Sequence, residues 1–170
     1  MSMTDSDWYS ALTRPSRTAS MVMLAFGLWI VLLSLVNIVE GAFYGEKVLW
    51  LEFLTNGSFD DISKTHDGIE ITLDDLFFSI IGIIFSGLGV MGLRSDGFQL
   101  SQLTTCLSGL FSSELGIRKT IADWMIVGGI IFYIAWSIQE GTWIDPGVFA
   151  VSVVPLAFGI GLNLLDSAET

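Results

Sequence analysis

Cysteine, histidine and basic residues are scarce in this sequence of 170 residues. It holds one cysteine, Cys106, and one histidine, His66, with seven lysines and arginines against 18 aspartates and glutamates. A single cysteine excludes an intramolecular disulfide and a cysteine metal cluster. One histidine leaves no pair for a haem and a poor ligand set for zinc. The net charge of −11 argues against nucleic-acid binding, which depends on clustered lysine and arginine.

Motifs of the common enzyme classes are also absent. The sequence has no G-x-S-x-G nucleophile elbow, no phosphate-binding glycine loop and no H-E-x-x-H zinc motif. A histidine-dependent triad would have to use His66, which has no matching nucleophile. We therefore expect no enzymatic activity, no cofactor and no metal centre.

Long apolar runs are what the sequence does have. Charged residues, only 15% of the chain, fall in clusters between these runs. A helix needs about 20 mostly apolar residues to cross the hydrocarbon core of a bilayer. Four segments meet or approach this length, at residues 19–39, 76–93, 121–138 and 147–165. The sequence therefore predicts an all-α integral membrane protein, with residues 1–170 forming one domain, a bundle of four transmembrane helices.

Helix-capping signals precede three of the four predicted spans. A side-chain acceptor before the first turn, an acid three residues later, or a proline at the first helical position each mark a helix start. The pairs are Thr72 with Asp75, Thr120 with Asp123, and Asp145 with Pro146. These acids are therefore interpreted as caps and not as catalytic groups.

The distribution of lysine and arginine predicts the orientation, because cytoplasmic loops carry an excess of them. Five basic residues precede the first span or lie between the second and third, namely Arg14, Arg17, Arg94, Arg118 and Lys119. Only Lys47 and Lys64 lie in the alternate segments. We expect a location in the cell membrane with both termini cytoplasmic and residues 45–75 external.

The predicted external segment contains its own signals for a small folded cap. Residues 48–54 form an apolar run too short to span, which predicts a short amphipathic helix at the membrane interface. The sequon at Asn56 is a glycosylation acceptor pattern. Further on, a turn at Asp67-Gly68 and the alternating apolar residues of 69–73 predict a short strand, with Thr65-His66 as its partner.

Acidic residues dominate this external segment. Four of them are weak candidates for attracting a cation: Asp60, Asp61, Asp67 and Glu70. Carboxylates next to turn glycines suit a hard cation such as calcium, but their spacing matches no EF-hand loop. A solvated acidic surface without a bound metal is the favoured interpretation.

The predicted cytoplasmic segment between the second and third spans is amphipathic. Over residues 98–115, leucine and phenylalanine recur at helical spacing with serine, threonine and glutamine opposite them. The polar face lacks lysine and arginine, so attraction to anionic lipid does not drive its binding. We expect a helix that docks against the bundle or against a partner.

Inside the predicted spans, no ionisable residue lies deep, whereas pumps and proton relays usually carry one. Small and weakly polar residues are common where transmembrane helices pack closely. The candidates for helix packing, or for lining a pore, are Ser79, Gly82, Ser86, Ser152, Ala157, Gly161 and Asn163.

Together these features favour a non-catalytic membrane protein that acts through assembly, as an accessory subunit of a membrane complex or as a homo-oligomer. The expected partners are the lipid bilayer and a second copy or other membrane subunits, with no nucleic acid. An oligomeric cation channel with an acidic external vestibule is the alternative, since acidic mouths concentrate cations. A membrane enzyme or small-molecule carrier ranks last.

Overall fold

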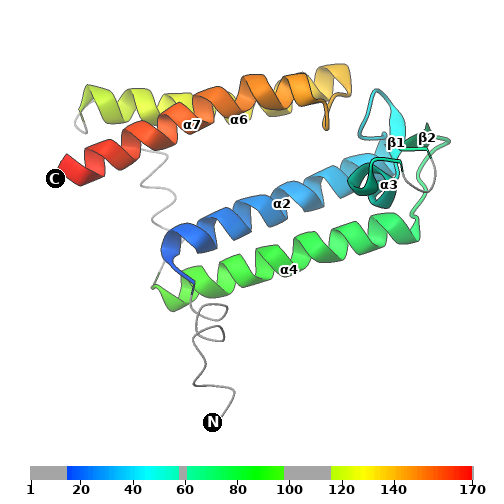
Figure 1. Ribbon diagram of the computed structural model, residues 1–170, viewed down its shortest axis with the longest axis horizontal. Coiled ribbons are helices and arrows are strands. Elements are labelled where there is room, and N and C mark those ends of the chain that lie inside the picture. The colour runs from blue at the N-terminus through cyan, green and yellow to red at the C-terminus, as the bar shows by residue number, and fades with distance from the viewer. Residues whose placement is uncertain (1–14, 58–60, 98–115, 170) are drawn as a thin grey trace, which may run out of the picture. The chain divides into compact units, whose positions relative to one another are not determined.

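The computed structural model describes residues 15–57, 61–97 and 116–169. Asp60 and the amphipathic segment predicted over 98–115 lie outside these described ranges. The chain divides into two compact units, residues 1–99 and 100–170. Each unit is built on a pair of long helices, α2 with α4 in the first and α6 with α7 in the second (Figure 1).

The four long helices confirm the four predicted helical segments. They are α2 (Arg17–Val39), α4 (Leu73–Ser95), α6 (Ile117–Glu140) and α7 (Pro146–Glu169). Each is long and apolar enough over its candidate window to cross a membrane. Large apolar side chains such as Val22, Ile83, Ile131 and Phe158 are more than half exposed on these helices. Such exposure suits helices surrounded by lipid, so a membrane location is indicated, and the helical content agrees with a bundle.

Glycine and serine allow α2 and α4 to approach each other closely. A Cβ atom added at Gly27 would lie 2.4 Å from the main-chain nitrogen of Ser86, and one added at Gly89 would lie 2.5 Å from the nitrogen of Leu24. Gly82 packs against the side chains of Ile30 and its neighbour in the same way. Small residues at such contacts let two backbones meet and gain dispersion energy over a long seam.

The α6–α7 pair uses the same device with different residues. A Cβ at Gly159 would lie 2.5 Å from the carbonyl oxygen of Ala122, and one at Gly129 would lie 3.1 Å from the ring of Pro155. From inside α6, the Tyr133 hydroxyl donates to the carbonyl of Trp143, in the loop between the helices, at 2.8 Å. This buried hydrogen bond fixes α6 to the loop that leads into α7.

Two of the three predicted helix caps are confirmed, and one prediction is wrong. Thr72 and Asp75 form a reciprocal capping box at the start of α4. The Asp145 carboxylate accepts from the nitrogens of Gly147 and Val148, and α7 begins at Pro146. Helix α6, however, begins at Ile117 after Gly116, so Thr120 and Asp123 lie inside it.

The reason for the failed cap is visible in the contacts of Asp123. Its carboxylate accepts from the Asn163 side-chain amide at 3.0 Å, and it lies 3.8 Å from the Lys119 ammonium. Thr120 and Asp123 are three residues apart, as in a capping box, although Asp123 in fact bonds to the neighbouring helix. Only the three-dimensional packing of α6 on α7 distinguishes the two roles.

Between α2 and α4, the chain forms a small cap, defined here as the described residues of 40–72. It contains strand β1 (Glu46–Val48), helix α3 (Trp50–Thr55) and strand β2 (Ser63–Thr65). The two strands are antiparallel, with Lys47 opposite Lys64. Helix α3 confirms the short helix predicted in the apolar run.

The strand predicted over residues 69–73 is wrong. Residues 63–65 pair with β1, which precedes them by many residues, and not with the alternating segment that follows the turn. Ile69 and Ile71 are 77% and 69% exposed in a stretch that contains a bend and no strand pairing. Alternation alone cannot choose between two possible partners, because strand pairing depends on which edge the fold brings near.

Candidate functional site: a buried ion pair between the cap and two helices

A buried ion pair joins the cap to the helices α2 and α4. The Lys47 ammonium of β1 lies 2.7 Å from Oδ2 of Asp75 in the first turn of α4. The two side chains are 1% and 0% exposed. Burial of an unpaired charge is strongly unfavourable, so each group makes the burial of the other possible.

Asp75 has both of its carboxylate oxygens engaged within the fold. Oδ2 also accepts from the nitrogen and the hydroxyl of Thr72, at 3.0 and 2.8 Å. Oδ1 accepts from the side-chain amide of Asn37 on α2 at 2.8 Å. The Lys47 ammonium donates in addition to the carbonyl oxygen of Glu70. The pair is therefore neutral as a whole and supported by hydrogen bonds on both sides.

Asn37 ties the cap backbone to the same place. Its amide nitrogen donates to the Val48 carbonyl at 2.9 Å, and its oxygen accepts from the Val48 nitrogen at 2.7 Å. The same oxygen accepts from the nitrogen of Ala42 at 3.3 Å. An asparagine supplies this pattern because its side chain carries a donor and an acceptor, as a neighbouring strand would.

One turn further along the helices, two hydroxyl groups continue the network. Ser79 on α4 donates to the main-chain carbonyl of Asp75 at 2.8 Å. The hydroxyl of Ser34 on α2 lies 2.5 Å from the Ser79 oxygen and 3.2 Å from the same carbonyl, and its single proton serves one of these two acceptors. Most buried hydroxyls in proteins are hydrogen-bonded in this way. The network thus runs from the cap into the α2–α4 contact.

A second acid in the first turn of α4 holds helix α3. The Asp74 carboxylate accepts from the main-chain nitrogens of Trp50 and Leu51. An acid at a helix N-terminus satisfies free N–H groups and interacts favourably with the helix dipole. The ring of Trp50 stacks on Phe78, with centroids 3.9 Å apart and an angle of 7° between the planes. Asp74 and Phe78 therefore fix α3 beside the start of α4.

A second lysine–glutamate pair in the cap has the opposite environment. Lys64 and Glu70 lie 3.0 Å apart, and their side chains are 41% and 57% exposed. The hydrogen bond and the charge of Lys64 lower the pKa of the Glu70 carboxyl below its ordinary value. Solvent screens the Lys64–Glu70 pair, whereas solvent has little access to the Lys47–Asp75 pair.

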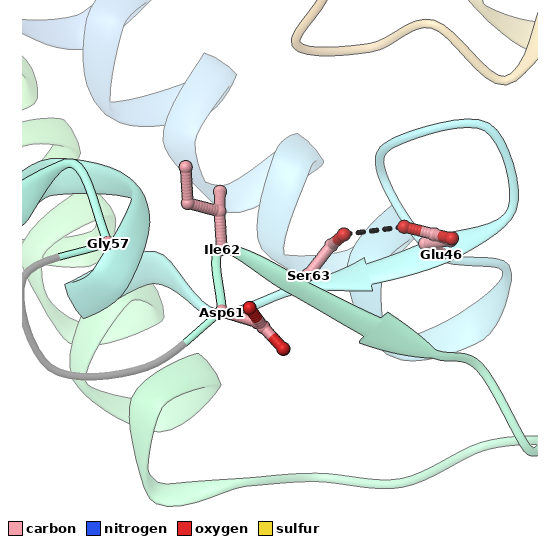
Figure 2. A pocket seen from close by; sticks show the side chains of 5 residues that line it. All are labelled: Glu46, Gly57, Asp61, Ile62 and Ser63. Carbon is pink, nitrogen blue, oxygen red and sulfur yellow. Dashed lines mark hydrogen bonds between the residues drawn. The ribbon is translucent and has the colours of Figure 1, made fainter.

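The cap also carries an open pocket of about 490 Å³. It is lined by Glu46, Gly57, Asp61, Ile62 and Ser63. Figure 2 shows the Ser63 hydroxyl donating to the Glu46 carboxylate across the neighbouring strands, with Asp61 directed to one side. Among the residues that the structure describes, no three His, Cys, Asp or Glu side chains come together as a metal site.

Of the predicted cation-attracting acids, the three that the structure describes have separate surroundings. Asp61 borders the open pocket, Asp67 is exposed in its turn, and Glu70 pairs with Lys64. Asn56, the predicted glycosylation acceptor, is exposed at the end of α3 in the left-handed conformation, with φ of 55°.

The candidate packing residues of α4 all face α2. Ser79 belongs to the buried network, and Gly82 and Ser86 lie at the closest approach of the two helices. In α7, Ser152 is buried and donates to the Val148 carbonyl of its own helix, while Asn163 bonds to Asp123. The remaining two α7 candidates are less buried than Ser152: Ala157 is exposed and Gly161 is half-buried.

Sequence reasoning missed Lys47 and Asp74 in the site and Gly27 in the α2–α4 contact. The count of basic residues assigns Lys47 to the external segment, and its neighbours Glu46 and Val48 give no signal of its burial.

Gly27 lies seven residues from both Ser20 and Ser34, a regular spacing of small residues that could have marked this face of the helix. Its role depends on Ser86, which is distant in sequence.

The chain was also compared with known proteins. No protein-family model, curated protein or solved structure matches it.

Proposed function

We propose that this chain is a non-catalytic polytopic membrane protein that acts through assembly, as an accessory subunit of a membrane complex or as a homo-oligomer. The observation that carries the proposal is a row of small residues on α7 that faces away from α6. The small residues of the row are Ala150, Ala157 and Gly161, with the larger Val154 between them. A Cβ added at Gly161 would meet no atom within 4 Å.

The helical period separates this row from the residues that contact α6. With 3.6 residues per turn, Ser152 and Gly159 fall on one face of α7, and Ala157 and Gly161 on the opposite face. The first face is buried against α6 at Ala122 and its neighbours. Two small residues four apart on a lipid-exposed face are typical of helix–helix association in membranes.

The buried polar groups support a non-catalytic role. The site has three buried charged or amide side chains, those of Lys47, Asp75 and Asn37. They bond to each other and to main-chain groups of the protein. Groups held in this way position the cap, and they are not presented to a substrate. This arrangement favours a structural role for the network.

The proposed orientation follows the basic residues. Both termini are cytoplasmic and the cap is external, since Arg17 and Arg94 lie at the ends of α2 and α4 away from the cap, and Arg118 and Lys119 lie in the first turn of α6, the next long helix along the chain. Labelling of a cysteine introduced at Asp67, in chains with Cys106→Ser, by an impermeant reagent on intact cells tests this sidedness.

The experiment on assembly is a mass measurement on the full chain in mild detergent and in nanodiscs. We expect a mass above that of one chain, or a stoichiometric membrane subunit bound to it. Gly161→Leu should reduce this assembly by filling the row, because a bulky side chain prevents close backbone contact. Gly128→Leu is the matched control, because Gly128 is exposed on α6, outside the row, and a Cβ there meets no atom within 4 Å. A monomer without a bound subunit contradicts the proposal.

The second candidate is an oligomeric cation channel, favoured by the exposed carboxylates of Asp61 and Asp67 on the cap. It ranks lower because Ser79 and Ser152 donate to backbone carbonyls in the contacts of their own units. Absence of cation conductance from the reconstituted protein in planar bilayers would remove it.

A further inference from the structure

We propose that α3 is an interfacial anchor, which lies in the headgroup region of the bilayer that the long helices cross and directs Leu51 and Leu54 into lipid. The inference rests on the membrane location in the proposed function. Its ligand is a lipid surface with neutral headgroups.

The contacts of α3 place it at the depth where α4 begins. Its first two main-chain nitrogens bond to Asp74, and its Trp50 ring lies flat on Phe78. Asp74 and Phe78 belong to the first two turns of α4, which is a candidate membrane span from Leu73 onward. A short helix held there lies beside the entry of that span into the apolar layer.

The outward surface at this level is apolar. Leu51 and Leu54, three residues apart on one side of α3, are 54% and 66% exposed. Close by in sequence to the anchoring residues of α4, Leu76 and Phe77 are 50% and 62% exposed. Aliphatic side chains on a short helix at the edge of a span gain free energy by entering the headgroup–acyl boundary.

The size and charge of α3 favour lipid over a protein partner as the occupant. A stable protein interface buries about 800 Å² per partner, far more than two leucines offer. The only charged residue of α3 is Glu52, which is 8% exposed, and α3 has no lysine or arginine. Its insertion is therefore driven by apolar burial and is independent of anionic lipid.

The test uses the full chain with Cys106→Ser, reconstituted in phosphatidylcholine nanodiscs. A spin label is attached at Leu54→Cys, and at Leu51→Cys as a second site. Its accessibility to oxygen, which enters lipid, is compared with that to a water-soluble nickel chelate. Labels at Leu28 and Ile83, exposed on α2 and α4, are the lipid references, and Asp67 is the water reference.

We expect the α3 labels to favour oxygen over nickel severalfold more than Asp67 does, equally with and without added phosphatidylglycerol. Nickel access like that at Asp67, or shielding from both reagents as under a protein partner, overturns the anchor. If the α3 labels are shielded from nickel only when phosphatidylglycerol is present, insertion of α3 depends on anionic lipid, and that part of the proposal is overturned. If Leu28 and Ile83 are themselves open to nickel, the membrane location fails, and the proposed function fails with it.

Discussion

Lys47 and Asp75 neutralise each other inside the protein, with 2.7 Å between the ammonium nitrogen and the carboxylate oxygen and almost no exposure of either side chain. The two residues come from different elements, β1 and α4. Their pairing, together with Asn37, joins the cap to both helices of the first unit. Loss of either partner would leave a charge that has no access to water.

Replacement of Lys47 by methionine should therefore destabilise the protein strongly. Removal of one partner of a buried ion pair costs about 3–5 kcal/mol, because the remaining charge stays desolvated. Thermal unfolding in detergent, followed by tryptophan fluorescence, measures the effect. Lys64→Met is the matched control on the paired strand, and it should leave the unfolding temperature nearly unchanged because Lys64 is 41% exposed. Equal effects of the two changes would contradict the role of burial.

The Glu70 carboxyl should titrate below its ordinary pKa of 4.5, chiefly because of the hydrogen bond from Lys64 and then its charge. A folded-state pKa below the unfolded value means that the pair's contribution is complete above the unfolded pKa and is lost as pH falls through the folded pKa. Carboxyl NMR titration measures this shift. In Lys64→Met the Glu70 pKa should rise toward the ordinary value. A Glu70 pKa that does not move would show that Lys64 is not the cause.

Gly27→Ala should weaken the α2–α4 contact. The new methyl group would approach the Ser86 nitrogen and hydroxyl to about 2.5 Å or less, and overpacking of this kind costs about 1–3 kcal/mol. Gly87→Ala is the control on the neighbouring residue of α4, where a Cβ meets nothing within 4 Å. The unfolding temperature should fall for Gly27→Ala alone, and a fall of the same size for Gly87→Ala would refute the seam.

Two glycines of α7 lie on opposite faces of the helix, Gly159 against α6 and Gly161 in open space. Gly159→Ala should destabilise the α6–α7 pair by about 1–3 kcal/mol, since its Cβ would lie 2.5 Å from the Ala122 carbonyl. Gly161→Ala has open space and should leave unfolding of the chain unaffected. Unfolding in mixed detergent measures both variants. If Gly161→Ala proves the more damaging change, the contact face of α7 has been assigned to the wrong side.

Much of the architecture could be predicted from local sequence. The four long helices follow from uncharged runs of span length, and the caps at Thr72 and Asp145 follow from short-range patterns, because these effects depend on neighbouring residues alone. The short helix in the cap was predicted for the same reason. The predicted segment over 98–115 stays a prediction.

The sequence by itself determined which stretches are apolar helices and where two of them begin, since transfer free energy and capping act over one segment at a time. Only the tertiary structure decided that Lys47 is buried, that Asp123 bonds across to Asn163, and that Ser63–Thr65 pairs with Glu46–Val48. Each of these depends on a partner distant in sequence. Whether a charge is buried, or which strand pairs with which, depends on the residues that the fold places next to it, and a local sequence pattern does not identify those residues.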